Sequence, residues 1–225
     1  MEIKPVAIIR TPFTRKFGIP RQSSLEDASR GVIEFEKDFR RPEALKGLEG
    51  FDYIWLIWEF SENGAKWEPC VRPPRLGGNV RMGVWATRST FRPNALALSC
   101  VRIETIDTKN CTITVRGADL MDGTPIYDIK PYIPYADSRP DARAGWTDSL
   151  PERLLEVEFA PEVLEDGSPL CDEALRTEIA GILRLDPRPS YHDDPERIYG
   201  LDYAGLKISF RVRGTRLTVL DCRII

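Results

Sequence analysis

The sequence FDYIWLIWEF, residues 51–60, gives the strongest strand signal in this chain. Aromatic and β-branched side chains occupy both its odd and its even positions, so we expect a central strand that is buried on both faces. The residues that follow are Ser61, Glu62, Asn63 and Gly64, which place polar groups at the rim of the predicted sheet.

Further strand patterns lie before and after this stretch, and little helix interrupts them. Residues 107–110 form the turn of a hairpin, and residues 122–125 form a second tight turn. Residues 14–24 are expected to be a loop, and residues 130–135 to be extended or polyproline-like. Strands joined by such short turns predict a closed or nearly closed β-barrel. The predicted strands are residues 3–10, 31–36, 80–86, 96–106, 111–116 and 126–129.

The composition changes at residues 138–151, a polar connector that contains proline. We place a domain boundary there, so that residues 1–148 form the barrel domain and residues 149–225 a small α+β domain. The second domain is expected to contain a strand at 156–159, a helix at 172–185 and a polar loop at 186–199. It ends in a hairpin, 207–213 and 216–223, whose cations could form a basic face: Lys207, Arg211, Arg213, Arg216 and Arg223.

The overall composition excludes several classes of protein. The longest apolar run, residues 53–58, is too short to span a bilayer, and the start MEIKPVAIIR predicts a strand and no signal peptide. Five dispersed cysteines suggest reduced thiols in a cytoplasmic protein. A single histidine, His192, without paired Cys/His spacing argues against a metal site and against Ser-His-Asp chemistry.

Positive charge is concentrated in the segment VRPPRLGGNVRMGVWATRSTFRPNALALS, residues 71–99, which contains Arg72, Arg75, Arg81, Arg88 and Arg92. No acidic residue occurs from 69 to 103, although the chain has 35 Asp and Glu against 32 Lys and Arg. Prolines and glycines fix turns between these arginines, so the cations are pre-organised donors for phosphate or carboxylate groups. The alternative is a solvated basic surface with no ligand.

Several long motifs follow one another along the chain: GIPRQ (18–22), LEGFDYIWLI (48–57), VRPPRLGGN (71–79), ATRSTFRPN (86–94), DLMDGTPIYDIKPYIPYADS (119–138) and DPRPSY (186–191). In this order they resemble the TsaA-like, TrmO-type tRNA methyltransferases. The resemblance implies a single-sheet β-barrel that binds S-adenosylmethionine, a small C-terminal α+β domain and a homodimer. It also implies methylation of N6 of threonylcarbamoyladenosine beside the tRNA anticodon.

The cofactor site is implied by this resemblance, since the chain lacks the glycine-rich turn of a Rossmann methyltransferase. Two departures from the family pattern stand near that site: Ser61 replaces a usual histidine, and Ala95-Leu96-Ala97 replaces Pro-Ile-Gly. These departures could alter cofactor affinity or mark a different acceptor. The implied cofactor-binding residues are Gln22, Ser23, Ser24, Ser61, Glu62, Arg88, Leu98, Asp122, Gly123, Thr124 and Pro125.

The expected reaction is a direct in-line methyl transfer, in which the protein aligns the two reactants and removes water. Phosphate contacts are assigned to Arg72, Arg75, Arg81 and Arg92, and a proton acceptor could be Asp128, Lys130 or Tyr132. Two alternatives stay open. One is an S-adenosylmethionine- or RNA-binding protein without turnover, and the other is transfer to a different RNA base or a small molecule.

Overall fold

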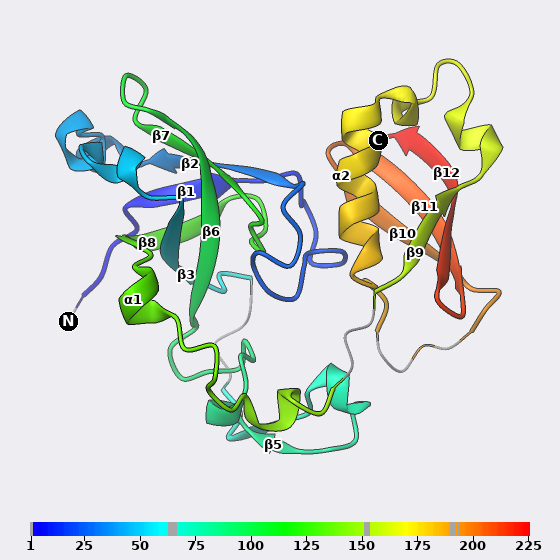
Figure 1. The fold of residues 1–225 in the computed structure, drawn as a ribbon, viewed down its shortest axis with the longest axis horizontal. Coiled ribbons are helices and arrows are strands. Elements are labelled where there is room, and N and C mark those ends of the chain that lie inside the picture. The colour runs from blue at the N-terminus through cyan, green and yellow to red at the C-terminus, as the bar shows by residue number, and fades with distance from the viewer. Residues whose placement is uncertain (1, 63–66, 151–153, 190–191, 193) are drawn as a thin grey trace.

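The computed structural model describes residues 2–62, 67–150, 154–189, 192 and 194–225. Two bodies of β structure lie side by side, and the segment around β4 (Cys70–Val71) and β5 (Met82–Gly83) extends away from the first of them (Figure 1). Motif residues 190–191 and rim residues 63–64 lie outside the described range. No helix of the described residues is both long and apolar enough to cross a membrane.

The first body is the predicted closed barrel, which the structure confirms. Its six strands run in the order β1-β2-β7-β6-β3-β8, and each pairs antiparallel with its neighbours. A barrel of this size is filled by its own side chains, so ligands bind at its ends and not through its centre. The strands are β1 (Ala7–Arg10), β2 (Arg30–Phe35), β3 (Tyr53–Glu59), β6 (Leu96–Asp107), β7 (Thr112–Arg116) and β8 (Thr124–Pro131).

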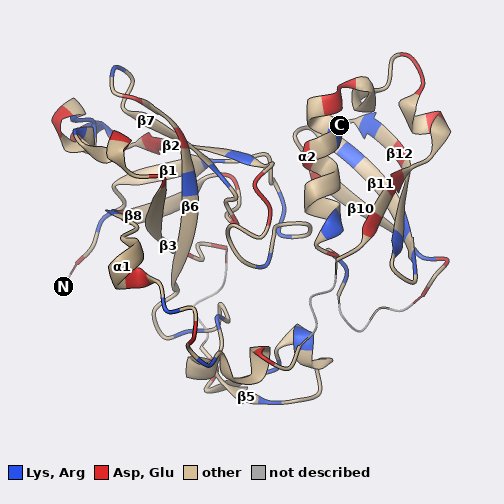
Figure 2. Cartoon of the chain, viewed as in Figure 1, with Lys and Arg blue, Asp and Glu red and all other residues tan. Residues whose placement is uncertain are grey.

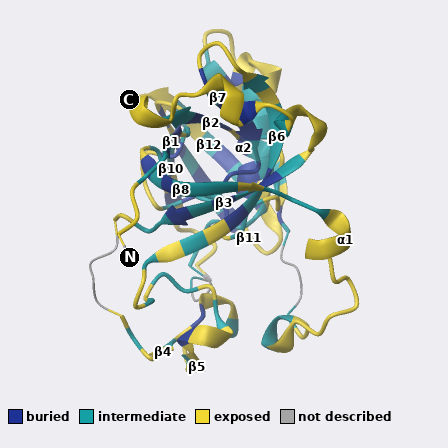
Figure 3. Ribbon diagram, turned by 90° about the vertical axis from the view of Figure 1, so that its left-hand side faces the viewer, coloured by how far each residue is buried: buried dark blue, intermediate teal, exposed yellow. Residues whose placement is uncertain are grey.

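Strand β3 is central, between β6 and β8, but the prediction that both its faces are buried is wrong. Ile54, Leu56 and Trp58 point into the barrel and are at most 6% exposed, whereas the alternate residues are only half-buried. The reason is closure, because a barrel wall has one inner and one outer face. Buried and half-buried positions therefore alternate along β3 (Figure 3). The outer residue Trp55, for example, is covered only in part.

The arginine-rich segment has less strand than predicted. Instead of a strand over residues 80–86, it forms a two-residue β5 (Met82–Gly83), paired with β4 (Cys70–Val71), and then a 3-10 turn. Gly77 and Gly78 have positive φ angles of 74° and 76°, so the chain turns sharply before a longer strand can form. The predicted extended run at 130–135 also ends early, in the short helix α1 (Pro134–Asp137). The 3-10 turns are Lys37–Phe39, Pro42–Leu45, Leu48–Gly50, Pro74–Leu76, Val84–Ala86, Gly145–Thr147, Pro161–Leu164 and Pro169–Cys171.

The second body packs α2 (Glu173–Arg184) against a sheet of order β10-β11-β12-β9. The helix begins where the sequence predicts, and Asp172 caps it by accepting a hydrogen bond from the Ala174 backbone N–H. The terminal hairpin, β11 (Leu206–Arg213) and β12 (Arg216–Ile224), is confirmed. Strand β9 (Glu156–Phe159) runs parallel to β12 at the sheet edge. Strand β10 (Ile198–Tyr203) was not predicted, and its first residues fall in the expected loop.

The loop between β1 and β2 contacts both bodies. Phe13 is only 1% exposed and belongs to the hydrophobic core of the second body, where its ring meets the edge of Tyr203 at 5.1 Å. Phe17 and Ile19 pack against the same core. The loop predicted for residues 14–24 therefore has a buried apolar side, which fixes its position beside the mouth of the barrel.

Candidate active site

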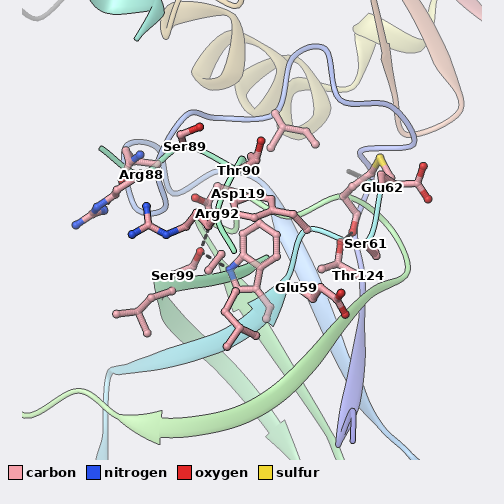
Figure 4. A pocket seen from close by; sticks show the side chains of 18 of the residues that line it. Glu59, Ser61, Glu62, Arg88, Ser89, Thr90, Arg92, Ser99, Asp119 and Thr124 are labelled. Atoms are coloured by element: carbon pink, nitrogen blue, oxygen red, sulfur yellow. Dashed lines mark hydrogen bonds between the residues drawn. The ribbon is translucent and has the colours of Figure 1, made fainter. Parts of the chain in front are cut away.

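A cavity of about 670 Å³ opens at one end of the barrel, within the range of small-molecule sites. Five segments form its walls: the end of β3, the start of β6, the loop that contacts the second body, the arginine-rich segment, and residues 119–124, which lead into β8 (Figure 4). The lining includes Lys16, Ile19–Gln22, Ile57–Glu62, Thr87–Thr90, Arg92, Leu96–Ser99, Asp119, Met121 and Thr124.

Six of the predicted cofactor residues line this cavity, although they come from five separate segments of the chain. The fold thus brings residues that are distant in sequence together around one cavity, as in a ligand-binding site. These six are Gln22, Ser61, Glu62, Arg88, Leu98 and Thr124.

The two predicted serines beside Gln22 do not line the cavity, and both bind the backbone of β6. Ser23 Oγ accepts a hydrogen bond from the Cys100 N–H at 3.0 Å, and Ser24 Oγ donates to the Cys100 carbonyl at 2.8 Å. Their hydroxyls hold the loop against the barrel.

Three residues of the predicted turn 122–125 also lie behind the wall of the cavity. Asp122 Oδ1 accepts a hydrogen bond from the Thr11 N–H at 3.1 Å, and the Gly123 N–H donates to the Ile9 carbonyl at 2.9 Å. Pro125 pairs with Ile8 across β1. These contacts tie the turn to β1.

Arg88 is oriented by the loop opposite. Its guanidinium donates to Gln22 Oε1, and the Gln22 amide donates to the Arg21 carbonyl at 2.6 Å. The Arg88 side chain is exposed on the rim of the cavity. Arg88 therefore presents a fixed positive charge to an anionic group that enters the cavity.

Arg92, which the sequence analysis assigned to a phosphate contact, also lines the cavity. Its guanidinium donates to the carbonyls of Thr87 at 2.9 Å and of Val84 at 3.2 Å, and lies 5.1 Å from the Trp85 ring centroid. These contacts hold the segment in shape around the cavity.

The other three predicted phosphate contacts, Arg72, Arg75 and Arg81, are exposed and do not line the cavity. They lie within the segment around β4 and β5, and Figure 2 colours the Lys and Arg positions of this segment. Trp85, in the same segment, is 69% exposed. Proteins that bind single-stranded RNA commonly use cations to contact the phosphates and aromatic side chains to stack on the bases.

The predicted proton acceptors lie outside the cavity. Asp128 and Lys130 form an ion pair with each other at 2.8 Å, and Tyr132 packs against the rings of Tyr53 and Trp55. Strand β8 meets the cavity at Thr124, so residues farther along it are carried away from the mouth.

Two linked hydrogen bonds at the floor of the cavity were not predicted from the sequence. The indole N–H of Trp58 donates to Ser99 Oγ at 2.9 Å, and the Ser99 hydroxyl donates to Asp119 Oδ1 at 2.6 Å. Burial raises the pKa of the Asp119 carboxyl above its ordinary value. The only signal in the sequence is the position of Asp119 at the head of the DLMDG motif.

A second acid at the cavity, Glu59, is engaged elsewhere. Its carboxylate accepts a hydrogen bond from the Tyr127 hydroxyl, which raises the pKa of Tyr127 to about 12. A phenol that donates to a carboxylate resists ionisation, because ionisation would bring two negative charges together.

The cations of the terminal hairpin are partly compensated by acids. Arg211 and Arg213 both pair with Glu196, and Arg216 pairs with Glu158 at 3.1 Å. Charges of both signs therefore cover this sheet (Figure 2), and it is a weaker electrostatic target for RNA than the segment around β4 and β5.

The cavity has the chemical groups that S-adenosylmethionine needs. Arg88 suits the carboxylate, an acceptor such as Glu62 suits amino and hydroxyl groups, and Ile57, Leu98 and other apolar side chains can cover an adenine ring. No cluster of three potential metal ligands occurs among the described residues.

Comparison with known proteins covers nearly the whole chain. The profile of the tRNA-methyltransferase O N-terminal domain matches residues 8–138, and that of the TrmO C-terminal domain matches residues 152–225. A crystal structure of TrmO from Pseudomonas aeruginosa superposes with a TM-score of 0.78 at 34% identity and covers 99% of this chain and 98% of its own.

Curated relatives give the same result. The tRNA (adenine(37)-N6)-methyltransferase of Escherichia coli K12 is 40% identical over 221 residues, which are 94% of this chain and 92% of the relative. A Pseudomonas aeruginosa relative, whose name places it among S-adenosylmethionine-dependent methyltransferases, is 40% identical over 97% of this chain and 96% of its own length.

Proposed function

This chain belongs to the tRNA-methyltransferase O family, and on that premise we propose that it methylates N6 of threonylcarbamoyladenosine at position 37 of tRNA. The broader activity is that of an S-adenosylmethionine-dependent tRNA (adenine-37-N6) methyltransferase. One observation carries the assignment to this site: a cavity of suitable size at the barrel mouth has Arg88 on its rim and the arginine-rich segment as one wall.

The cofactor is proposed to occupy this cavity. When bound, it supplies a methyl group on a positively charged sulfur. Arg88, held by Gln22, binds the carboxylate, while Leu98 covers the adenine and Ser61, Glu62 and Thr124 offer polar contacts. The remaining predicted residues support the wall of the cavity without lining it. Ser23 and Ser24 position the loop, and Asp122, Gly123 and Pro125 fix the start of β8.

The tRNA is proposed to approach along the segment around β4 and β5. Arg72, Arg75 and Arg81 would bind phosphates, which fixes the position of the RNA without reading its sequence. An adenosine in the anticodon loop is unpaired, so it can leave its neighbours and enter the cavity at little energetic cost. The threonyl carboxylate of the modified base then gives a cavity arginine, such as Arg92, a second role.

We further propose residues 1–148 as the cofactor domain, residues 149–225 as a second domain, and a homodimer as the assembly. The two hydrophobic cores support the division, although Phe13 belongs to the core of the second domain. Ser61 and Ala95–Ala97 stand at the cavity end of β3 and β6, where the Phe60 N–H donates to the Ala95 carbonyl at 2.9 Å. The departures from the family pattern therefore lie beside the proposed cofactor.

The test is transfer of labelled methyl from S-adenosylmethionine to tRNA with and without the threonylcarbamoyl group. We expect label only on the modified tRNA. Label on both would keep the methyltransferase and discard the proposed substrate. Cofactor binding by calorimetry with no label on either would favour the alternative of a binding protein without turnover.

A further inference from the structure

We propose that Asp119 is the catalytic base that takes the N6 proton of the acceptor adenosine. This inference rests on the proposed function, because it assigns a step of that reaction to a residue of the same cavity. None of the acceptors named from the sequence, Asp128, Lys130 or Tyr132, lines the cavity, so the role is open.

The hydrogen bonds at the cavity floor have a fixed direction. An indole N–H can only donate, so the Trp58 side chain occupies a lone pair of Ser99 Oγ. The Ser99 hydroxyl is then free to direct its proton to Asp119 Oδ1, at 2.6 Å. The backbone of Ser23 also donates to the same carboxylate. These donors orient the Asp119 side chain and favour its ionised form.

Burial acts in the opposite sense and dominates, so the pKa of Asp119 is raised. The hydrogen bonds and the nearby Arg88 charge offset only part of this effect. A carboxylate with a raised pKa is a stronger base than one in water, yet remains ionised when its pKa stays below the working pH. The other charged side chains that line the cavity are Lys16, Arg21, Glu59, Glu62, Arg88 and Arg92.

The other two acids are less suited to the task. Glu59 already accepts the Tyr127 hydroxyl proton, and its strand position places it on the outer face of the barrel. Glu62 follows the end of β3 and is exposed on the rim, where its carbonyl accepts a hydrogen bond from Lys16. Figure 4 shows both glutamates on one side of the cavity, and Asp119 on the other side, near Ser99, Arg88 and Arg92.

The acceptor explains why a base is needed. In threonylcarbamoyladenosine the N6 lone pair is delocalised into both the purine ring and the carbonyl of the carbamoyl group, so the neutral nitrogen is a weak nucleophile. In the proposed step the N6–carbon bond forms as the sulfur–carbon bond breaks, and the bonding pair returns to sulfur. The N6 proton passes to Asp119, so charge and atoms balance.

The test compares Asp119→Asn with Ser99→Ala. The asparagine keeps the size of the side chain and an oxygen that can accept from Ser99, but it cannot take a proton. We expect Asp119→Asn to bind S-adenosylmethionine within about threefold of wild type by calorimetry, and to lose about 10²- to 10⁴-fold in single-turnover methyl transfer. Wild type should lose rate at acid pH as Asp119 is protonated, and the residual rate of Asp119→Asn should lack this fall.

Ser99→Ala removes a hydrogen bond that lowers the Asp119 pKa. The acid limb of the rate profile should therefore move to higher pH. Titration of the Asp119 carboxyl carbon by NMR in the free protein should show the same shift, independently of activity. A purely structural Asp119 would leave the acid limb in place.

Three results would overturn the inference. Loss of cofactor binding in Asp119→Asn in proportion to activity would make Asp119 a cofactor contact, and an unchanged rate would make it structural. An acid limb that persists in Asp119→Asn would assign it to another group. Failure of the proposed function looks different, since wild type itself would then not methylate threonylcarbamoyl-modified tRNA.

Discussion

Replacement of Phe13 by alanine tests whether the loop between β1 and β2 links the second hydrophobic core to the cofactor cavity. The Phe13 ring is 1% exposed and packs edge-on against Tyr203. The loop backbone is fixed beside it, because the Ala204 N–H donates to the Pro12 carbonyl at 3.1 Å. Six residues farther along, Ile19 already lines the cavity.

Truncation of a buried phenylalanine to alanine costs about 3–5 kcal/mol, since it removes apolar contacts and leaves a hole. We expect the second body to lose this amount of stability. Hydrogen exchange of the β11 amides should then accelerate by about 10²- to 10⁴-fold under native conditions. Loosening of the loop should add an ordering cost of about 0.5–1.5 kcal/mol to cofactor binding, which corresponds to a two- to tenfold weaker affinity by calorimetry.

The matched control is Phe39→Ala. Phe39 is 41% exposed in a 3-10 turn of the barrel and lies outside both cores. We expect this change to cost less than about 1 kcal/mol and to leave cofactor affinity unaltered. The coupling argument would be refuted if Phe13→Ala destabilised the second body while the affinity for S-adenosylmethionine stayed the same.

Three more predictions follow from single contacts. Arg88→Ala should weaken cofactor binding, whereas Arg75→Ala should spare it and weaken tRNA binding, with a salt-dependence slope shallower by about 0.7–0.9; loss of cofactor binding in both would contradict this division. Gly18→Ala should cost more stability in urea unfolding than Gly47→Ala, because both glycines have positive φ but only the Cβ at 18 would meet another side chain, at 2.0 Å; equal costs would mean that backbone strain alone matters. The Tyr127 phenol should titrate near pH 12 by ultraviolet absorbance. Its hydrogen bond to Glu59 therefore stabilises the fold fully below about pH 10, and this stabilisation is lost as the pH rises toward 12. Titration at the usual pH of a tyrosine would exclude this hydrogen bond.

The sequence predicted those parts of the fold that local pattern controls. The alternation at 111–116 and the Gly214-Thr215 turn each specify a strand or hairpin through neighbours only, and the structure has them. Over residues 80–86 the same reasoning was wrong, because positive-φ glycines and a 3-10 turn interrupt the apolar pattern. Burial of β3 on one face was missed because its half-buried outer residues Tyr53, Trp55 and Ile57 are also apolar, so the sequence shows no alternation of apolar and polar positions.

The family resemblance supplied candidate members of the site, six of which line the cavity, but it did not supply their arrangement. Gln22 and Arg88 are 66 residues apart in sequence, and only the fold reveals their hydrogen bond. Asp119 was not identified from the sequence, where nothing distinguishes it from a solvated carboxylate beside a turn. Its importance depends on burial and on Ser99, which reaches it from β6.

The same loop that lines the cavity also explains how the two bodies act together. Arg21 donates to the Arg188 carbonyl at 2.9 Å, and Arg15 pairs with Asp202 at 2.9 Å, so the loop is held from the second body on its outer side. On its inner side, Gln22 orients Arg88. We therefore predict that a tRNA contact to the second body is coupled, through this loop, to Arg88, the residue proposed to hold the cofactor carboxylate. By reciprocity, cofactor binding should alter tRNA affinity by the same factor.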